Sequence, residues 1–234
     1  MITFFVLGML DAMAELSLIL KLYRLPMRQH WFKILLFVIG VSLFSMCMRL
    51  YFNLTLLDLP IQYLIFILFL RIGMKIKLHL SAFIAGTGII AYILLQIGIF
   101  AVGRMVVDAG PGLLMENSGT FVHAIQLISD LLVLAIALFM YKTYRGFSFI
   151  IWPPHDFFKK EDYFSYQNAP VVIGSILSLV TVSLTFILLY TSNVTGFIIM
   201  TLITFGVSYY CSRRKDYDDV RAAVEEYRNT HQKR

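Results

Sequence analysis

Charged residues are scarce in this chain of 234 residues, where Asp, Glu, Lys and Arg together fill 15% of the positions and hydrophobic residues fill 59%. A soluble domain has about 25% charged and about 45–50% apolar residues, so this composition excludes a soluble enzyme and indicates an integral membrane protein. Cysteine is rarer still. The chain has only Cys47 and Cys211, which we expect at opposite faces of the membrane, and that separation excludes an internal disulfide.

The common catalytic motifs are missing as well. The sequence has no GxxxxGK[ST] phosphate loop, no GxGxxG, no HExxH and no CxxC. Neither cysteine has a histidine at a matching depth that could activate it as a nucleophile. We therefore expect neither an enzyme nor a bound cofactor or metal ion.

Long apolar runs fill most of the chain. Seven of them are long enough to cross a bilayer as helices, and the expected spans are 2–21, 34–51, 60–76, 80–102, 119–141, 171–190 and 195–211. The first span has no basic start and no cleavage site, so we expect it to be retained. The sequence thus predicts an all-α bundle of seven transmembrane helices over 1–212, followed by a charged helical tail over 213–234.

The basic residues predict how the chain is oriented. Lys and Arg are retained at the cytoplasmic side of a membrane, and here they gather in the connections 21–33, 71–77 and 142–160 and in the tail. This bias predicts a multi-pass cell-membrane protein whose N-terminus lies outside and whose C-terminus is cytoplasmic. The net charge of +6 then reflects topology, with the lipid bilayer as the partner and no nucleic acid.

Several polar and ionisable residues fall where the bilayer disfavours them. An ionised side chain in mid-span costs about 2.5–3.5 kcal/mol, so such residues normally face the interior of a helix bundle. The candidates are Asp11, Glu15, Arg49, Tyr92, Gln96, His123, Gln126 and Asp130. Counting the helix rise inward places Asp11 and Asp130 both near mid-depth. We expect a polar pocket open to the outside that binds a ligand or an ion, with Arg49 paired to Asp11; a structural ion pair is the alternative.

The last two expected spans carry no charge, and small or hydroxyl side chains follow one face of each. These are Gly174, Ser178, Thr181 and Thr185 in the first, and Thr201, Thr204 and Ser208 in the second. Such faces let helix backbones approach closely, which predicts a packed hairpin.

The tail repeats residues at the 3-4 spacing of a coiled-coil seam. The repeat consists of Tyr217, Val220, Val224, Tyr227 and His231, which we expect to transmit a signal. A short parallel coiled coil in a homodimer and an ordinary solvated helix both fit this pattern.

One local pattern resembles a known family. The stretch LLDLPIQ at 56–62, the basic residues at 71, 75 and 77, and the RLP turn at 24–26 resemble the membrane-sensor regions of Gram-positive sensor histidine kinases. The resemblance covers about residues 1–215 and implies a peptide-pheromone receptor whose cytoplasmic helix leads to a GHKL-type ATPase domain. The kinase part is lacking here, because His231 is followed by Gln232 where the family has an acidic residue, and no ATPase domain follows in this sequence.

The leading functional hypothesis is a bacterial membrane sensor that detects a small amphiphile such as a peptide, as in quorum sensing. It would pass the signal through the tail to a cytoplasmic kinase or response regulator of a two-component system. An ion-coupled transporter or permease that uses Asp11, Glu15 and Asp130 as a relay is the second hypothesis. A structural or immunity-type membrane protein is the third.

Overall fold

The computed structural model describes residues 2–106, 119–150, 165, 168–190 and 194–232, and over these residues it is all-helical without a strand. Five segments are long and apolar enough to cross a membrane: Ile2–Leu22, Arg28–Tyr51, Leu78–Gly103, Phe121–Thr143 and Thr195–Asn229. Ala169–Thr185 is a shorter apolar helix. The all-α fold class is confirmed, and these helices are those of a membrane-embedded protein. A total of seven spans stays a prediction.

The long helices follow the apolar runs closely. They are α1 (Ile2–Leu22), α2 (Trp31–Met46), α3 (Thr55–Leu68), α4 (Leu78–Val106), α5 (Thr120–Thr143), α6 (Ala169–Tyr190) and α7 (Val194–Gln232). A 3-10 turn, η1 (Arg28–His30), precedes α2, and π-helical turns, η2 (Cys47–Tyr51) and η3 (Phe69–Gly73), extend α2 and α3. Two expected bounds are corrected. The third span was expected at 60–76, whereas α3 begins at Thr55 and its extension η3 ends at Gly73. The fourth was expected to end at residue 102, whereas α4 continues to Val106.

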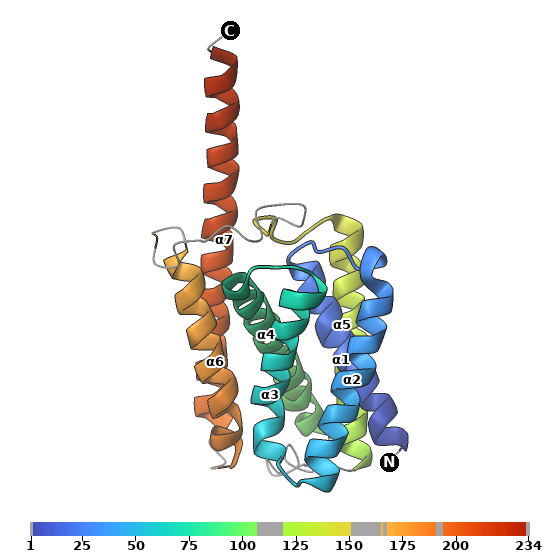
Figure 1. Cartoon of the computed structure of the whole chain (residues 1–234). Coiled ribbons are helices and arrows are strands. Elements are labelled where there is room, and N and C mark those ends of the chain that lie inside the picture. The colour runs from blue at the N-terminus through green and yellow to red at the C-terminus, as the bar shows by residue number, and fades with distance from the viewer. Residues whose placement is uncertain (1, 107–118, 151–164, 166–167, 191–193, 233–234) are drawn as a thin grey trace.

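The helix α7 crosses the expected boundary between bundle and tail without a break. It has 39 residues and contains neither Gly nor Pro after Gly206, so nothing in its backbone ends the helix where the apolar run ends. Ion pairs between Arg214 and Asp218 and between Arg221 and Glu225 support the charged part. Figure 1 shows α7 rising out of the bundle at one end, here called the tail end; the N-terminus lies at the opposite end.

The helix α4 is central in the bundle. It contacts α1 and α5 on one side and α6 and α7 on the other (Figure 1). Of its most apolar stretch of 18 residues, 61% is buried. Glycines permit these close approaches. A Cβ on Gly88 would lie 2.2 Å from Cγ1 of Ile19 in α1, and one on Gly86 would lie 2.4 Å from Cβ of Ser178 in α6.

The predicted packing of the last two spans is confirmed for α6 and α7. Their hydroxyl faces are buried, and the hydroxyls of Thr181 and Thr204 lie 2.7 Å apart in a hydrogen bond. Two members of the α6 face pack elsewhere: Gly174 lies against Phe83, and Ser178 lies against Gly86, both in α4. The reason is that α6 packs against both α4 and α7, so its small residues lie in two helix–helix contacts.

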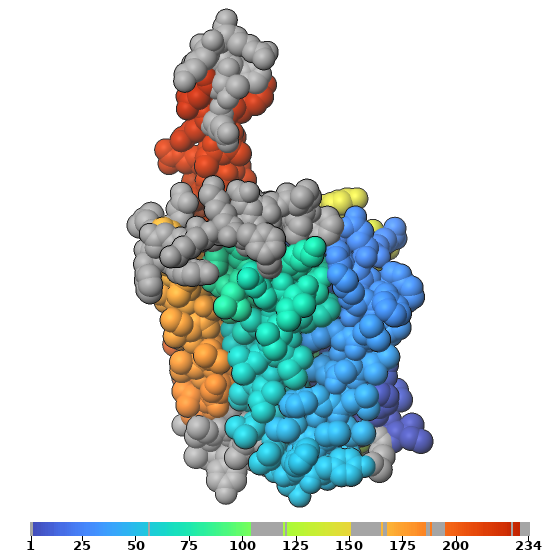
Figure 2. Space-filling view, in the orientation of Figure 1, coloured from blue at the N-terminus to red at the C-terminus, as the bar shows by residue number. Residues whose placement is uncertain are grey.

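The outer wall of the bundle is apolar. Large hydrophobic side chains are exposed on several helices; among them are Leu35, Leu36, Leu43, Ile128, Leu131, Phe139, Ile173, Ile176, Leu202 and Ile203. The space-filling view shows α2, α3 and α6 side by side on one such face (Figure 2). Monomeric soluble proteins rarely expose apolar surface on this scale, so the wall suits contact with lipid chains.

Candidate functional site

Four polar side chains from three helices meet inside the bundle, and we call them the carboxylate cluster: Asp11 and Glu15 of α1, Tyr92 of α4 and Asp130 of α5. The Tyr92 hydroxyl lies 2.7 Å from Oδ1 of Asp130 and also hydrogen-bonds with Oδ1 of Asp11. Asp130 is 0% exposed, and Ala14, Leu18 and Val133 pack around the Tyr92 ring. The three helices reach the cluster because α1, α4 and α5 pack against one another.

Glu15 lies one helical turn from Asp11, on the same face of α1. Its side chain is buried, and it interacts electrostatically with Asp11 and Asp130. No group in the described part of the chain donates a hydrogen bond to its carboxylate. The second oxygen of Asp130, Oδ2, is likewise buried and lacks a hydrogen-bond partner among the described residues. The cluster therefore contains acidic oxygens without matching donors.

The expected pairing of Arg49 with Asp11 is wrong. The Arg49 guanidinium instead forms an ion pair with Asp58 of α3, here called the Asp58 ion pair. Asp58 is 0% exposed and also accepts hydrogen bonds from Ser45 Oγ at 2.8 Å and from Gln62 Nε2 at 3.0 Å. Asn53, with φ +53°, turns the chain between η2 and α3, so Asp58 comes within reach of Arg49. The first turn of a helix also favours a carboxylate.

Asp58 is the buried acidic residue that sequence reasoning did not list as a site residue. The expected spans 34–51 and 60–76 leave Asp58 in the connection between them, although it stands at the start of an apolar run with Gln62 four residues further on. That spacing is the signal that could have identified it, since residues at i and i+4 share a helix face.

Among the described residues, the remaining candidates form no hydrogen bond with the carboxylate cluster. Gln96 lies on α4, and His123 and Gln126 lie on α5; all are partly buried. The Nδ1 atom of His123 is buried and unpartnered within the described residues. The predicted pocket open to the outside stays a prediction. No group of three or more His, Cys, Asp or Glu in the described chain is arranged to hold a metal ion.

At the tail end, a short segment ties three helices together, and we call residues 146–150 the strap. The Phe147 amide donates to the Leu22 carbonyl at the end of α1, with 2.8 Å between the atoms. The amide and the hydroxyl of Ser148 donate to Oδ1 of Asp216 in α7, at 2.6 and 2.7 Å. The strap is separated from the end of α5 by two residues, so it links α5 to α1 and α7.

Aromatic packing fixes the strap. The rings of Phe147 and Phe149 lie 5.7 and 5.6 Å from the ring of Tyr23, whose hydroxyl hydrogen-bonds to Ser212 Oγ of α7 at 3.0 Å. Gly146 has φ +137°, and a Cβ there would lie 2.8 Å from the carbonyl oxygens of Lys21 and Leu22. Only glycine fits this position without strain.

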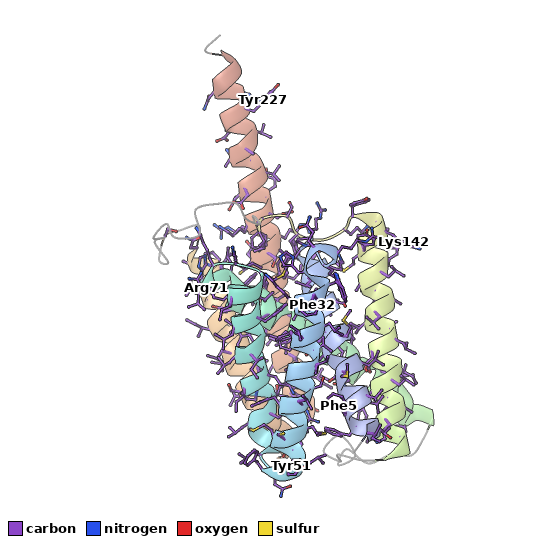
Figure 3. The ribbon with its side chains drawn as sticks, turned by 45° about the vertical axis from the view of Figure 1, so that its right-hand side comes forward. Phe5, Phe32, Tyr51, Arg71, Lys142 and Tyr227 are labelled. Carbon is purple, nitrogen blue, oxygen red and sulfur yellow. The ribbon has the colours of Figure 1, made fainter. Side chains whose placement is uncertain are left out.

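The tail presents the expected repeat to solvent. Tyr217, Val220, Val224 and Tyr227 are all exposed, and Tyr227 lies far from the bundle (Figure 3). His231 belongs to α7, but its side chain lies outside the described residues. Both cysteines are free, as predicted.

No protein-family model, no curated protein and no solved structure matches this chain.

Proposed function

We propose that the protein is a seven-span membrane sensor module that passes a signal to a cytoplasmic partner through α7. The observation that carries this proposal is the form of α7. A helix of 39 residues is about 58 Å long at 1.5 Å per residue, and a bilayer core is only about 30 Å thick. About half of the helix is thus available beyond the lipid, and the strap holds it at the point where it leaves the bundle.

The orientation belongs to the proposal, with the N-terminus outside and the tail in the cytoplasm. Arg71 and Lys142 both lie at the tail end (Figure 3), where the positive-inside rule expects basic residues. The tail itself supplies further Lys and Arg.

The strap supports transmission between the carboxylate cluster and the tail. Asp130 lies on α5, and the strap follows α5 in the chain. The strap hydrogen-bonds to α1 at Leu22 and to α7 at Asp216. A shift of α5 against α1 would move the strap and change its hold on α7. Sliding of packed helices is a common way to switch between two states. As the resemblance implies, the signal would be a small amphiphile such as a peptide, and the partner a kinase or response regulator.

Site-specific photo-crosslinking from α7 in native membranes tests the proposal. A photoreactive phenylalanine analogue at Val224, which is 55% exposed, is expected to capture a kinase or response-regulator chain. The matched control places the same group at Ile203, exposed on the wall of the bundle, and should capture no such chain. A Val224 probe that reacts with lipid alone would contradict the proposal.

The carboxylate cluster favours ion-coupled transport as a second candidate function. Acidic residues buried between spans are typical of proton and cation pathways. The purified protein in liposomes distinguishes the two proposals. Ion or solute flux that depends on pH and is lost in Asp130→Asn would favour transport, whereas a sensor gives no flux.

A further inference from the structure

The hydrogen bonds of the carboxylate cluster do not balance if every acid is ionised. A tyrosine hydroxyl has one hydrogen and can donate it to one acceptor, whereas an ionised carboxylate only accepts. The Tyr92 oxygen nevertheless lies within hydrogen-bond distance of Asp11 Oδ1 and of Asp130 Oδ1. If Tyr92 donates to one carboxylate, the other carboxyl must itself hold a hydrogen and donate it to the Tyr92 oxygen.

None of the described residues forms an ion pair with the acids of the carboxylate cluster. The groups that face the cluster are Asp11 and Glu15 of α1, Tyr92 of α4, Asp130 of α5, Asp58 of α3 and Arg49 of η2. Arg49 is the one cation in this set, and it pairs with Asp58. An acidic group that is buried without a partner of opposite charge takes up a proton more easily than it stays ionised.

Two further buried acidic groups also favour a bound proton. Oδ2 of Asp130 is shielded from solvent and has no partner among the described residues, although a carboxylate oxygen in an apolar interior normally finds a donor. The Glu15 carboxyl, on a side chain only 5% exposed, faces Asp11 and Asp130 and receives no hydrogen bond from the described chain. A proton is the one donor that needs no additional space beside these oxygens.

We infer that the carboxylate cluster is a proton-binding site in which Asp11 and Asp130 share one proton across Tyr92. The proton comes from water and returns to it, and no other bond forms or breaks. With the proton bound, the cluster joins α1, α4 and α5. Without it, α1 and α5 carry adjacent negative charges that repel. The inferred effect of this repulsion on the strap and α7 rests on the proposed function, whereas the proton site itself does not.

Infrared spectroscopy of the full chain in lipid vesicles at neutral pH tests the proton site. The neutral carboxyl C=O band is the readout, because an ionised carboxylate does not give it. Glu15→Gln first removes the contribution of Glu15. In that variant the band is expected to persist, and a further Asp11→Asn or Asp130→Asn is expected to abolish it. An exposed acid of the tail, changed by Asp218→Asn, is the matched control and should leave the band unchanged.

Absence of the band in Glu15→Gln would overturn the inference, because Asp11 and Asp130 would then both be ionised. Loss of the band on addition of sodium ions would also overturn it in favour of a cation site. If the Asn variants do not fold, Tyr92→Phe keeps the shape of the side chain and removes the bridging hydroxyl. The band is then expected to shift in frequency, and an unchanged band would contradict the shared proton.

A fluorescent label on the tail tests separately whether the proton site is coupled to α7, as the proposed function requires. In a background of Cys47→Ser and Cys211→Ala, a fluorophore on Val224→Cys should change its emission when the pH is raised. The same label should stay silent in Asp130→Asn. If the infrared band behaves as expected while the label is silent in both proteins, the proton site stands and its coupling to α7 is refuted.

Discussion

The two buried acidic sites of the bundle differ in how their charge is balanced. Asp58 forms an ion pair with Arg49 and accepts hydrogen bonds from Ser45 and Gln62, so its carboxylate is fully paired although it is 0% exposed. Asp130 is equally buried but accepts a hydrogen bond only at Oδ1, from Tyr92, and its other oxygen has no partner in the described chain. The Asp58 ion pair therefore fixes η2 against α3, whereas the carboxylate cluster can exist in more than one charge state. Burial alone does not distinguish a structural acid from a responsive one.

The strongest test of this comparison removes the cation of the Asp58 ion pair. Arg49→Met leaves Asp58 charged and buried, and breaking a buried ion pair costs about 3–5 kcal/mol. We expect the free energy of unfolding in mixed detergent micelles, followed by circular dichroism, to fall by this amount. The double variant Arg49→Met/Asp58→Leu should regain most of the loss, because it leaves no unpaired charge. A single variant as stable as the parent would show that the pair contributes nothing.

A substitution in the strap is expected to have an effect of intermediate size on stability. Gly146→Ala places a Cβ against the Lys21 and Leu22 carbonyl oxygens at a positive φ, which costs about 1–3 kcal/mol. We expect faster hydrogen exchange at the Phe147 and Ser148 amides together with this loss of stability. Gly40→Ala is the matched control, since a Cβ there meets nothing within 4 Å, and alanine favours the helix. Equal effects of the two substitutions would argue against a strained strap.

The smallest effect is expected at the carboxylate cluster. Asp130→Asn keeps the size of the side chain and replaces an acid that already shares a proton, so the free energy of unfolding at neutral pH should change by less than about 1 kcal/mol. A loss as large as that of Arg49→Met would abolish the contrast between the two sites.

The pH dependence sharpens the same contrast. A folded state that holds a proton which the unfolded chain releases loses stability as the pH rises. The parent protein should therefore lose stability between neutral and alkaline pH relative to Asp130→Asn, as measured by unfolding at a series of pH values. A parent protein with the same pH dependence as Asp130→Asn would indicate that Asp11 and Asp130 are already ionised in the folded state at neutral pH.

The sequence predicted the helices better than their contacts. Apolar runs bounded by charge locate most of the helices within a few residues, because lipid-facing and buried positions are both apolar in such a bundle. The exception is α3, which begins five residues before the expected span at 60–76. Depth along the helix axis brought Asp11 and Asp130 to the same level, and the structure joins them through Tyr92. Depth does not give the direction in which a side chain points, which is why Arg49 was assigned to the wrong acid.

The strap shows a different limit of sequence reasoning. Phe147 and Phe149 stand in a stretch of mixed aromatic and charged residues, and composition alone does not tell which aromatic side chains are buried. Their position follows from contacts with Tyr23, more than a hundred residues earlier in the chain. The continuity of α7 was missed for a similar reason, since the change from apolar to charged residues at 212 alters the surroundings of the helix and leaves its backbone unchanged.

Under the proposed function, the uninterrupted backbone of α7 also determines what kind of signal the tail would carry. Because α7 has neither Gly nor Pro after Gly206, no such residue favours a kink between the bundle and the end of the tail. A rotation of α7 near Asp216 would therefore also turn the exposed repeat of the tail, including Val224 and Tyr227, to face another direction. A partner bound to that repeat would register an angle and would need no side chain to be newly uncovered.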